Sequence, residues 1–179
     1  MNAKKILLAM ALSSLMAAGA HAASTDQGHG KITFLGSVID APCSIDAKSL
    51  DQTIQLGAIS KNQLSEGGKS TPVGFDIQLH DCDSATANKA SITFNGLAGD
   101  KTDGLDGAFA VTGQAAGVGV VIADMGGKVI KPSTKSALAA MNDGDNDLQF
   151  LAYVQGSTAS DAVVPGNFGA IANFMMTYE

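Results

Sequence analysis

The sequence contains no arginine and no tryptophan among its 179 residues. Its eleven basic residues are all lysines, against seventeen acidic residues, so the formal net charge is −6 at pH 7. A nucleic-acid-binding protein needs a basic surface to neutralise phosphates, and a protein held on an anionic membrane surface needs a polybasic segment. The composition therefore argues against both of these classes.

Long apolar runs are also rare, and the one at residues 6–20 lies near the N-terminus. It follows two lysines and leads into Ala20-His21-Ala22, which is the order of a signal peptide with an A-x-A cleavage site. An N-terminal anchor helix is the alternative, but the run is short for a membrane span. We therefore predict a signal peptide over residues 1–22 and an exported mature chain that begins at Ala23.

Cysteine occurs only twice, at Cys43 and Cys82. An even count in an exported chain predicts one disulfide, here closing a loop of about 40 residues, and chain-entropy estimates give such a bond about 3–4 kcal/mol. Two free thiols or a metal pair are the alternatives. No histidine or third cysteine lies at ligand spacing that would support a metal pair.

Charged residues make up only 16% of the chain, whereas glycine is abundant, with 21 residues. Most of the mature chain alternates apolar and polar residues in short runs separated by Gly, Asp, Asn and Ser, which is typical of strands joined by turns. One short helical turn is expected at residues 135–141. The predicted strands cover residues 31–40, 53–59, 72–81, 90–94, 108–111, 118–125, 128–130, 148–155 and 168–178. This series predicts an all-β, immunoglobulin-like sandwich in one domain.

The two ends of the mature chain share one pattern. In residues 166–179 the even positions are apolar, small or aromatic, and residues 28–38 alternate with the same parity. Each run has the period of a strand with one buried face. A strand at each end of an exported chain suggests assembly by strand exchange between subunits.

Motifs for catalysis or metal binding are weak. Residues 80–83 (HDCD) include a histidine beside a cysteine, but neighbouring residues of a strand point to opposite faces. Residues 143–147 (DGDND) resemble the start of a calcium loop, but Leu148 and Val154 stand where the pattern needs glycine and glutamate. We therefore expect neither an enzyme nor a metal or cofactor site.

Several motifs, taken in order, resemble one family. They are G-K-I-T-F-x-G-x-V-x-x-A-P-C at residues 30–43, L-H-D-C at 79–82, G-x-G-V-x-I at 117–122, L-Q-F-L-A-Y at 148–153 and N-F-x-x-x-x-N-F-x-M-x-Y at 167–178. This set is similar to the major structural pilins of chaperone–usher fimbriae in Gram-negative bacteria, most of all the P-pilus and mannose-resistant branch. The resemblance covers essentially the whole mature chain.

The resemblance implies an incomplete immunoglobulin-like sandwich that lacks its last strand and is completed by a donor strand from a neighbouring subunit. A periplasmic chaperone would first lend a strand, and the N-terminal extension of the next identical subunit would replace it at the outer-membrane usher. The product would be a fimbrium on the cell surface, ending in tip adhesin or adaptor subunits. A minor adaptor or tip subunit, and a self-sufficient periplasmic β-sandwich, remain alternatives.

The resemblance also assigns residues to roles. Residues 23–34 would be the donor extension, residues 35–179 the pilin domain, and the inserted face would carry Gly28, Gly30, Ile32 and Phe34. Gly30 resembles the family's small residue over a shallow part of the groove, although Gly28 has the same parity. The alternative for residues 32–38 is the first strand of the chain's own sheet. We expect that role for the later half of the run, so that the segment serves both purposes, with the boundary between Phe34 and Val38.

The C-terminal run would form the edge of the groove and the strand that pairs with the chaperone. Its predicted members are Gly166, Phe168, Ala170, Ala172, Phe174, Met176 and Tyr178. Basic chaperone residues would capture the terminal carboxylate of Glu179. An ordinary C-terminal core strand is the alternative here.

Overall fold

The computed structural model describes residues 28–179, so the predicted signal peptide and residues 23–27 lie outside the described residues. The chain divides into two compact units, Met1–Val38 and Ile39–Glu179. Residues 28–38 of the first unit are extended and contain no strand or helix. The strand predicted at residues 31–40 is therefore wrong for the single chain, because a strand needs a hydrogen-bonded neighbour to form.

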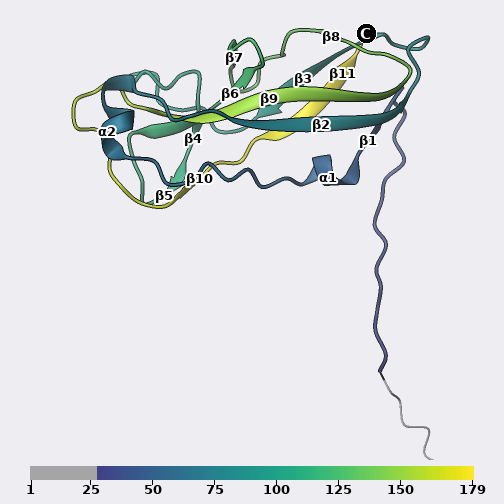
Figure 1. Cartoon of the computed structure of the whole chain (residues 1–179), viewed down its shortest axis with the longest axis horizontal. Helices are drawn as coiled ribbons and strands as arrows, with labels where there is room; N and C mark the ends of the chain where they lie inside the picture. Colours follow the sequence, from purple (N-terminus) through teal and green to yellow (C-terminus); the bar gives the residue numbers. More distant parts are fainter. Residues whose placement is uncertain (1–27) are drawn as a thin grey trace, which may run out of the picture. The chain divides into compact units, whose positions relative to one another are not determined.

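The second unit is built almost entirely of strands (Figure 1). Three short helical turns, α1 (Ala47–Leu50), α2 (Lys61–Leu64) and the 3-10 turn η1 (Ser65–Gly67), precede the long strands. The strands are β1 (Ser44–Ile45), β2 (Val73–Cys82), β3 (Lys89–Asn95), β4 (Phe109–Ala110), β5 (Thr112–Gly113), β6 (Val118–Asp124), β7 (Val129–Ile130), β8 (Ala139–Ala140), β9 (Gly144–Gly156), β10 (Phe168–Gly169) and β11 (Asn173–Tyr178).

The strands form two main antiparallel layers of an immunoglobulin-like sandwich. One sheet has the order β1-β2-β9-β6-β4, with β7 paired to β6, and the other has the order β11-β3-β8. A separate pair joins β10 to β5. The second layer ends at β11, which pairs with β3 on one side only, so the sheet is open at this edge.

The core lies between the layers and follows the predicted alternation. Ile77 and Leu79 of β2 are fully buried, and the alternate β9 residues from Leu148 onward are buried as well. Aromatic rings connect the sheets, because the Phe94 ring of β3 lies 5.2 Å from the Phe150 ring of β9. This buried face is the main source of stability for the sandwich.

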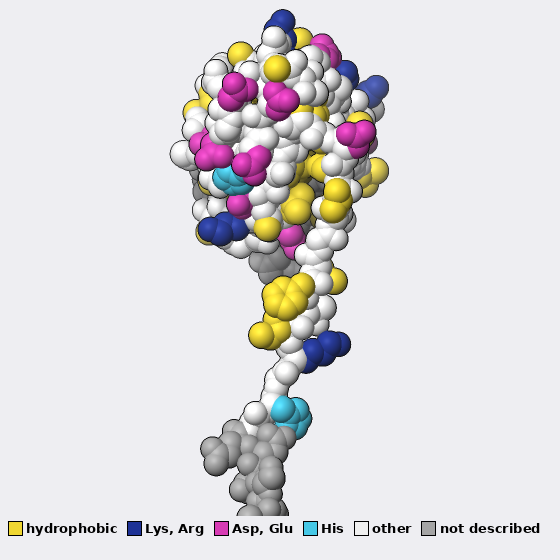
Figure 2. All heavy atoms as spheres, turned by 90° about the vertical axis from the view of Figure 1, so that its right-hand side faces the viewer, with side chains coloured by type: hydrophobic (Ala, Val, Ile, Leu, Met, Phe, Trp, Pro, Cys, Tyr) yellow, Lys and Arg dark blue, Asp and Glu magenta, His cyan; other side chains and the backbone are white. Residues whose placement is uncertain are grey.

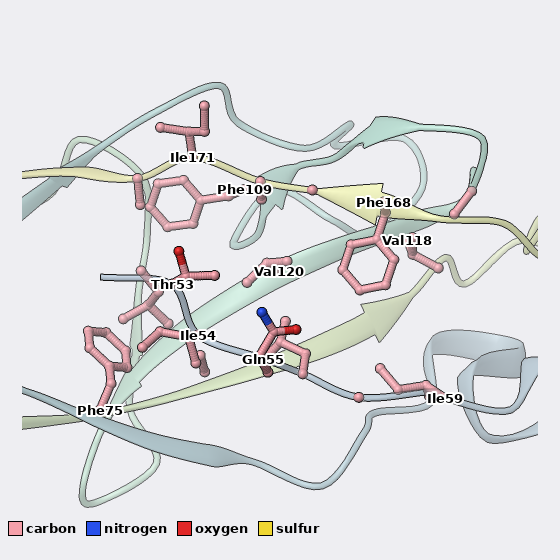
Figure 3. A pocket seen from close by; sticks show the side chains of 18 of the residues that line it. Thr53, Ile54, Gln55, Ile59, Phe75, Phe109, Val118, Val120, Phe168 and Ile171 are labelled. Carbon is pink, nitrogen blue, oxygen red and sulfur yellow. The ribbon is translucent and has the colours of Figure 1, made fainter. Parts of the chain in front are cut away.

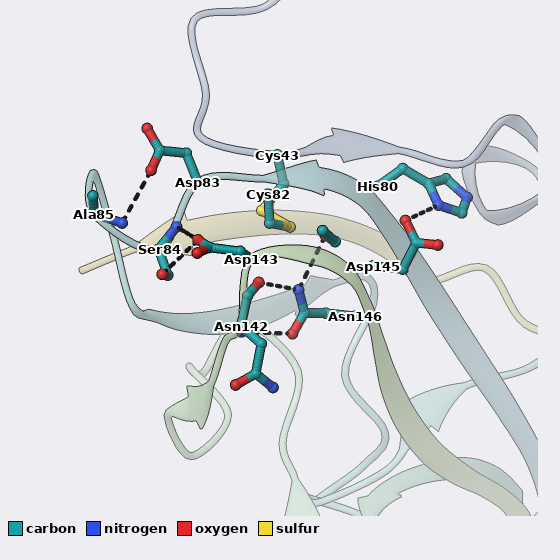
Figure 4. Close-up of a disulfide and its surroundings, with 11 residues drawn as sticks. Cys43, His80, Cys82, Asp83, Ser84, Ala85, Asn142, Asp143, Asp145 and Asn146 are labelled. Atoms are coloured by element: carbon teal, nitrogen blue, oxygen red, sulfur yellow. Dashed lines mark hydrogen bonds and ion pairs between the residues drawn. A yellow bond between two sulfur atoms is a disulfide. The ribbon is translucent and has the colours of Figure 1, made fainter.

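The disulfide expected from the cysteine count joins Cys43 to Cys82 (Figure 4). It connects the chain just before β1 to the last residue of β2, the strand with which β1 pairs. Both sulfur-bearing residues are buried in the main core cluster. The bond therefore fixes the point at which the N-terminal segment enters the domain.

Two other predictions are wrong. Residues 135–141 form no helix, because Ser136 donates from its backbone N–H to the Ile92 carbonyl and β8 pairs with β3, which overrides a weak local helix preference. Residues 53–59 form no strand and pair with no neighbour within residues 28–179. The remaining predicted strands are confirmed by β2, β3, β4, β6, β7 and β9, whereas the C-terminal run is divided between β10 and β11.

Candidate functional site

A groove of about 1050 Å³ opens along the sandwich (Figure 3). Its two walls are residues 49–59 on one side and residues 163–174 on the other. Its floor is apolar and comes from strands of both sheets: Phe75, Ile77, Phe94, Phe109, Val118, Val120, Ile122 and Ala152. Figure 3 shows Val120 on the strand that runs along the bottom of the groove, between the two walls.

The first wall has an unpaired backbone. Residues 53–59 make no backbone hydrogen bond to any part of the described chain. Ile54 and Leu56 are half-buried, and Leu56 packs against the cluster that contains Val118. The wall is held at its start, where the Gln52 side chain donates to the Asp76 carbonyl at 2.7 Å. Its N–H and C=O groups are thus available to another strand.

The second wall also presents free backbone groups. β11 is an edge strand, and residues 170–172 make no backbone hydrogen bond within the described residues. The continuous strand predicted for 168–178 is interrupted at this point. A Cβ atom on Gly96, at the end of β3, would lie 2.6 Å from the Ile171 carbonyl oxygen, so the chain passes close over Gly96 there.

The structure places the predicted groove-edge residues in three environments. Phe174, Met176 and Tyr178 are half-buried against the main core, whereas Ala170 and Ala172 are exposed. Phe168 packs on the cluster around Val118 at the other end of the groove. Phe168, Ala170, Ala172 and Phe174 line this wall of the groove, whereas Met176 and Tyr178 lie beyond its lining, on the part of β11 that pairs with β3.

The ends of this wall are closely packed. A Cβ atom on Gly166 would lie 2.7 Å from the backbone nitrogen of Ala115, so a glycine is required for the chain to pass there. At the other end, Glu179 pairs its backbone with Lys89, and its side chain lies 3.6 Å from the Lys135 ammonium. The hydroxyl of Tyr178 is buried without a partner among the described residues, and burial raises the pKa of this phenol.

The predicted donor residues lie in the first unit. Ile32 and Phe34 are 78% and 88% exposed, and Leu35, of opposite parity, is 93% exposed. Figure 2 shows the apolar side chains of this segment, in yellow, projecting from its backbone. Gly28 and Gly30 belong to the same extended stretch. Both faces of the segment are exposed, so burial does not show which face would be inserted. The prediction for the even-numbered residues depends on the alternation of the sequence alone.

The role of residues 53–59 as a wall of the groove was not predicted from the sequence. Residues 53–59 alternate as a strand should, and nothing in their residue types indicates that the neighbouring strand is absent. The contribution of Phe109 to the floor was also missed, because β4 has only two residues. One signal was available in the sequence. More segments have an alternating apolar face than there are strands in the chain to cover those faces.

The acidic run at residues 143–147 serves as a structural turn (Figure 4). Asp143 accepts hydrogen bonds from the backbone N–H and the hydroxyl of Ser84, which lower the pKa of this carboxyl. Asp145 contacts His80. Over residues 28–179 no group of three or more histidine, cysteine, aspartate or glutamate side chains is arranged to hold a metal ion. The same range holds no helix long and apolar enough to span a bilayer.

Comparison with known proteins gives the same family for the whole domain. The family model described as "Fimbrial protein" matches residues 32–179. The Fimbria A protein of Serratia marcescens is 46% identical over 179 residues, which span all of both chains. A solved structure of a chaperone–usher pilus is similar, with a TM-score of 0.71 and 36% identity, and the match covers 86% of this chain and 97% of that chain. A solved structure of the P pilus rod subunit PapA is also similar, with a TM-score of 0.68 and 33% identity, and the match covers 78% of this chain and 100% of that chain. The chain therefore belongs to the fimbrial protein family, whose members are structural subunits of surface pili and not enzymes.

Proposed function

We propose that this fimbrial subunit polymerises by strand donation, with residues 23–34 of one copy filling the groove of the next. The observation that carries the proposal is the groove itself, which combines an apolar floor with free backbone groups on both walls. Addition of a strand satisfies both features at once. The donor has the matching chemistry, an extended segment with exposed Ile32 and Phe34.

The inserted face carries Gly28, Gly30, Ile32 and Phe34. Burial of the Ile32 and Phe34 side chains on the apolar floor contributes about 1.5–3 kcal/mol each. Each new backbone hydrogen bond adds about 0.5–1.5 kcal/mol. The contact is head-to-tail, so repeating it produces an open fibre and not a closed pair.

Before assembly the groove needs a temporary occupant, because an exposed apolar groove with free strand edges promotes aggregation. A periplasmic chaperone would lend a strand along the wall that contains Phe168, Ala170, Ala172, Phe174, Met176 and Tyr178, and would bind the carboxylate of Glu179. The outer-membrane usher would then exchange this strand for the donor segment. The fibre would be displayed on the cell surface, and its outer end would carry tip adhesin or adaptor subunits.

A peptide of residues 23–38 tests the donor assignment when it is titrated into the chaperone-bound subunit. We expect the peptide to displace the chaperone, as measured by native gel or size-exclusion chromatography. Gly30→Arg in the peptide should weaken displacement about tenfold or more, because a charged side chain is forced onto an apolar floor. Thr33→Arg adds the same charge on the opposite face and should have little effect.

Two further results would decide the register. A Gly28→Arg peptide tells which glycine lies over the shallow part of the groove, since only that position rejects a side chain. Equal displacement by the unmodified, Gly30→Arg and Phe34→Asp peptides would show that residues 23–34 are not the donor.

A further inference from the structure

His80 lies between two carboxylates that belong to different elements of the sheet. Its Nδ1 atom is 2.9 Å from Asp145 Oδ1 at the start of β9, and its Nε2 atom is 3.2 Å from Asp46 Oδ2, just after β1. The ring itself is on β2, between these two neighbours, and is 38% exposed. Figure 4 shows the contact with Asp145.

The contact set matches an imidazolium better than a neutral ring. A neutral imidazole has one N–H donor and can serve only one of the two carboxylates, whereas the protonated ring donates to both. Hydrogen bonds to Asp145 and then to Asp46 raise the pKa of His80 above its ordinary value of 6.5.

The other charged groups nearby are mostly acidic. Asp147 lies opposite Gln78 in the β2–β9 register, and Asp76 and Asp81 are on β2 itself. Lys48 of α1 is the cation beside Asp46, and its backbone N–H is the main cause that lowers the pKa of that carboxyl. Among these acidic groups, the two carboxylates in contact with the ring, Asp145 and Asp46, favour its charged form.

Asp46 lies three residues before the first wall of the groove, which begins at Ser49. Its side chain caps α1 by accepting from the Lys48 N–H at 2.8 Å, and its backbone N–H donates to the Gln78 carbonyl. Within α1, the Ser49 hydroxyl accepts from the Gln78 N–H, and the Gln52 contact with β2 follows the helix. Residues 53–59 then have no backbone anchor of their own. The N-terminal end of the wall is therefore anchored to the sheet through residues 46–52, whereas Leu56 and Ile59 hold its middle by packing on the apolar cluster around Val118.

We propose that His80 is a pH-dependent clamp, which in its protonated form ties the base of the groove wall to both β2 and β9 and in its neutral form releases one of the two. This inference deepens the proposed function, because the clamped segment is the wall that receives the donor strand. The direction follows from the raised pKa: the contribution of the clamp is complete below about pH 6.5 and is lost as the pH rises through the higher value of the folded protein.

Hydrogen–deuterium exchange on the chaperone-bound mature subunit, in which residues 23–34 of no other copy occupy the groove, tests the clamp. Peptides that cover residues 46–59 are compared between about pH 5.5 and about pH 8.5, after correction for chemical exchange, with peptides from β6 as the internal reference. We expect opening of residues 46–59 to be about two- to fivefold more frequent at the higher pH. The pH effect should disappear in His80→Gln, which keeps a polar side chain but does not titrate.

A second measurement does not depend on the folding of that variant. The imidazole of His80 is titrated by NMR in the unmodified chain and in Asp145→Asn, which retains the ring and a hydrogen-bonding side chain. The clamp requires a lower midpoint in Asp145→Asn. An unchanged midpoint, or a pH effect on residues 46–59 that is equal in the unmodified chain and in His80→Gln, would overturn the proposal. Neither readout requires strand donation, so a failed clamp is distinguishable from a failed donor assignment.

Discussion

A mature chain that carries a second copy of residues 23–38 after Glu179, joined by a short linker, is expected to be a soluble monomer that unfolds in one cooperative transition. The unmodified mature chain, expressed without a partner, should aggregate, be degraded or polymerise. The physical reason is the groove: its apolar floor and two free strand edges stay exposed until a strand occupies them. A tethered strand supplies that occupant within one molecule, at a high effective concentration.

The appended strand begins next to the edge of the sheet with which it should pair. β11 ends at Tyr178, and a strand that follows it through a tight turn runs back antiparallel along the free edge of β11. Chemical denaturation followed by circular dichroism, with mass measurement by light scattering, gives the readout.

The matched control carries Ile32→Asp and Phe34→Asp in the appended copy only. This control has the same length and linker, but it should behave like the unmodified chain. A control that is as stable and monomeric as the unmodified appended copy would show that the added strand does not act through the groove.

Phe34→Asp in the donor segment should reduce fibre assembly by at least about 100-fold, whereas Leu35→Asp should reduce it little. Both side chains are almost fully exposed in the single chain, so exposure does not distinguish them. Parity does, because Phe34 shares the inserted face with Ile32, and Leu35 points away from it. Phe34→Asp loses the burial of an aromatic ring and places a charge on an apolar floor.

Assembly is measured as the yield and length of fibres by electron microscopy and by sedimentation of purified subunits released from the chaperone. The Leu35→Asp chain is the matched control, since it has the same charge change one residue away. Equal loss in both variants would indicate a general effect of charge on the segment, and loss in Leu35→Asp alone would mean that the inserted face has the other parity.

The strands that were predicted correctly are those whose partners belong to the same chain. β2 and β9 pair with each other over most of their length, and their alternation matches the buried faces at Ile77, Leu79 and Phe150. The local sequence is sufficient to predict such strands, because the alternation marks a segment that is able to pair and the chain supplies the strand with which it pairs. The disulfide between Cys43 and Cys82 was also predicted correctly, because both of its partners belong to the same chain.

The two segments that were predicted as strands and are not share one physical cause, whereas the interruption of the C-terminal run has another. Residues 31–40 and 53–59 have the alternation of strands, but in the single chain they have no strand partner. The interruption at 170–172 depends on the close approach of Ile171 to Gly96, which is a tertiary contact that no local pattern reports. Sequence periodicity predicts which segments are able to pair, whereas pairing itself depends on which neighbours are present.

Amide hydrogen exchange in assembled fibres tests the central claim most directly. The claim is that the domain lacks a strand of its own and acquires one from another subunit. It predicts that residues 53–59 and 170–172, the unpaired parts of the two walls, exchange at least about 100-fold more slowly in fibres than in subunits whose groove is empty. Fast exchange on both walls in intact fibres would contradict the account, as would a partner-free monomer in which both walls are already protected.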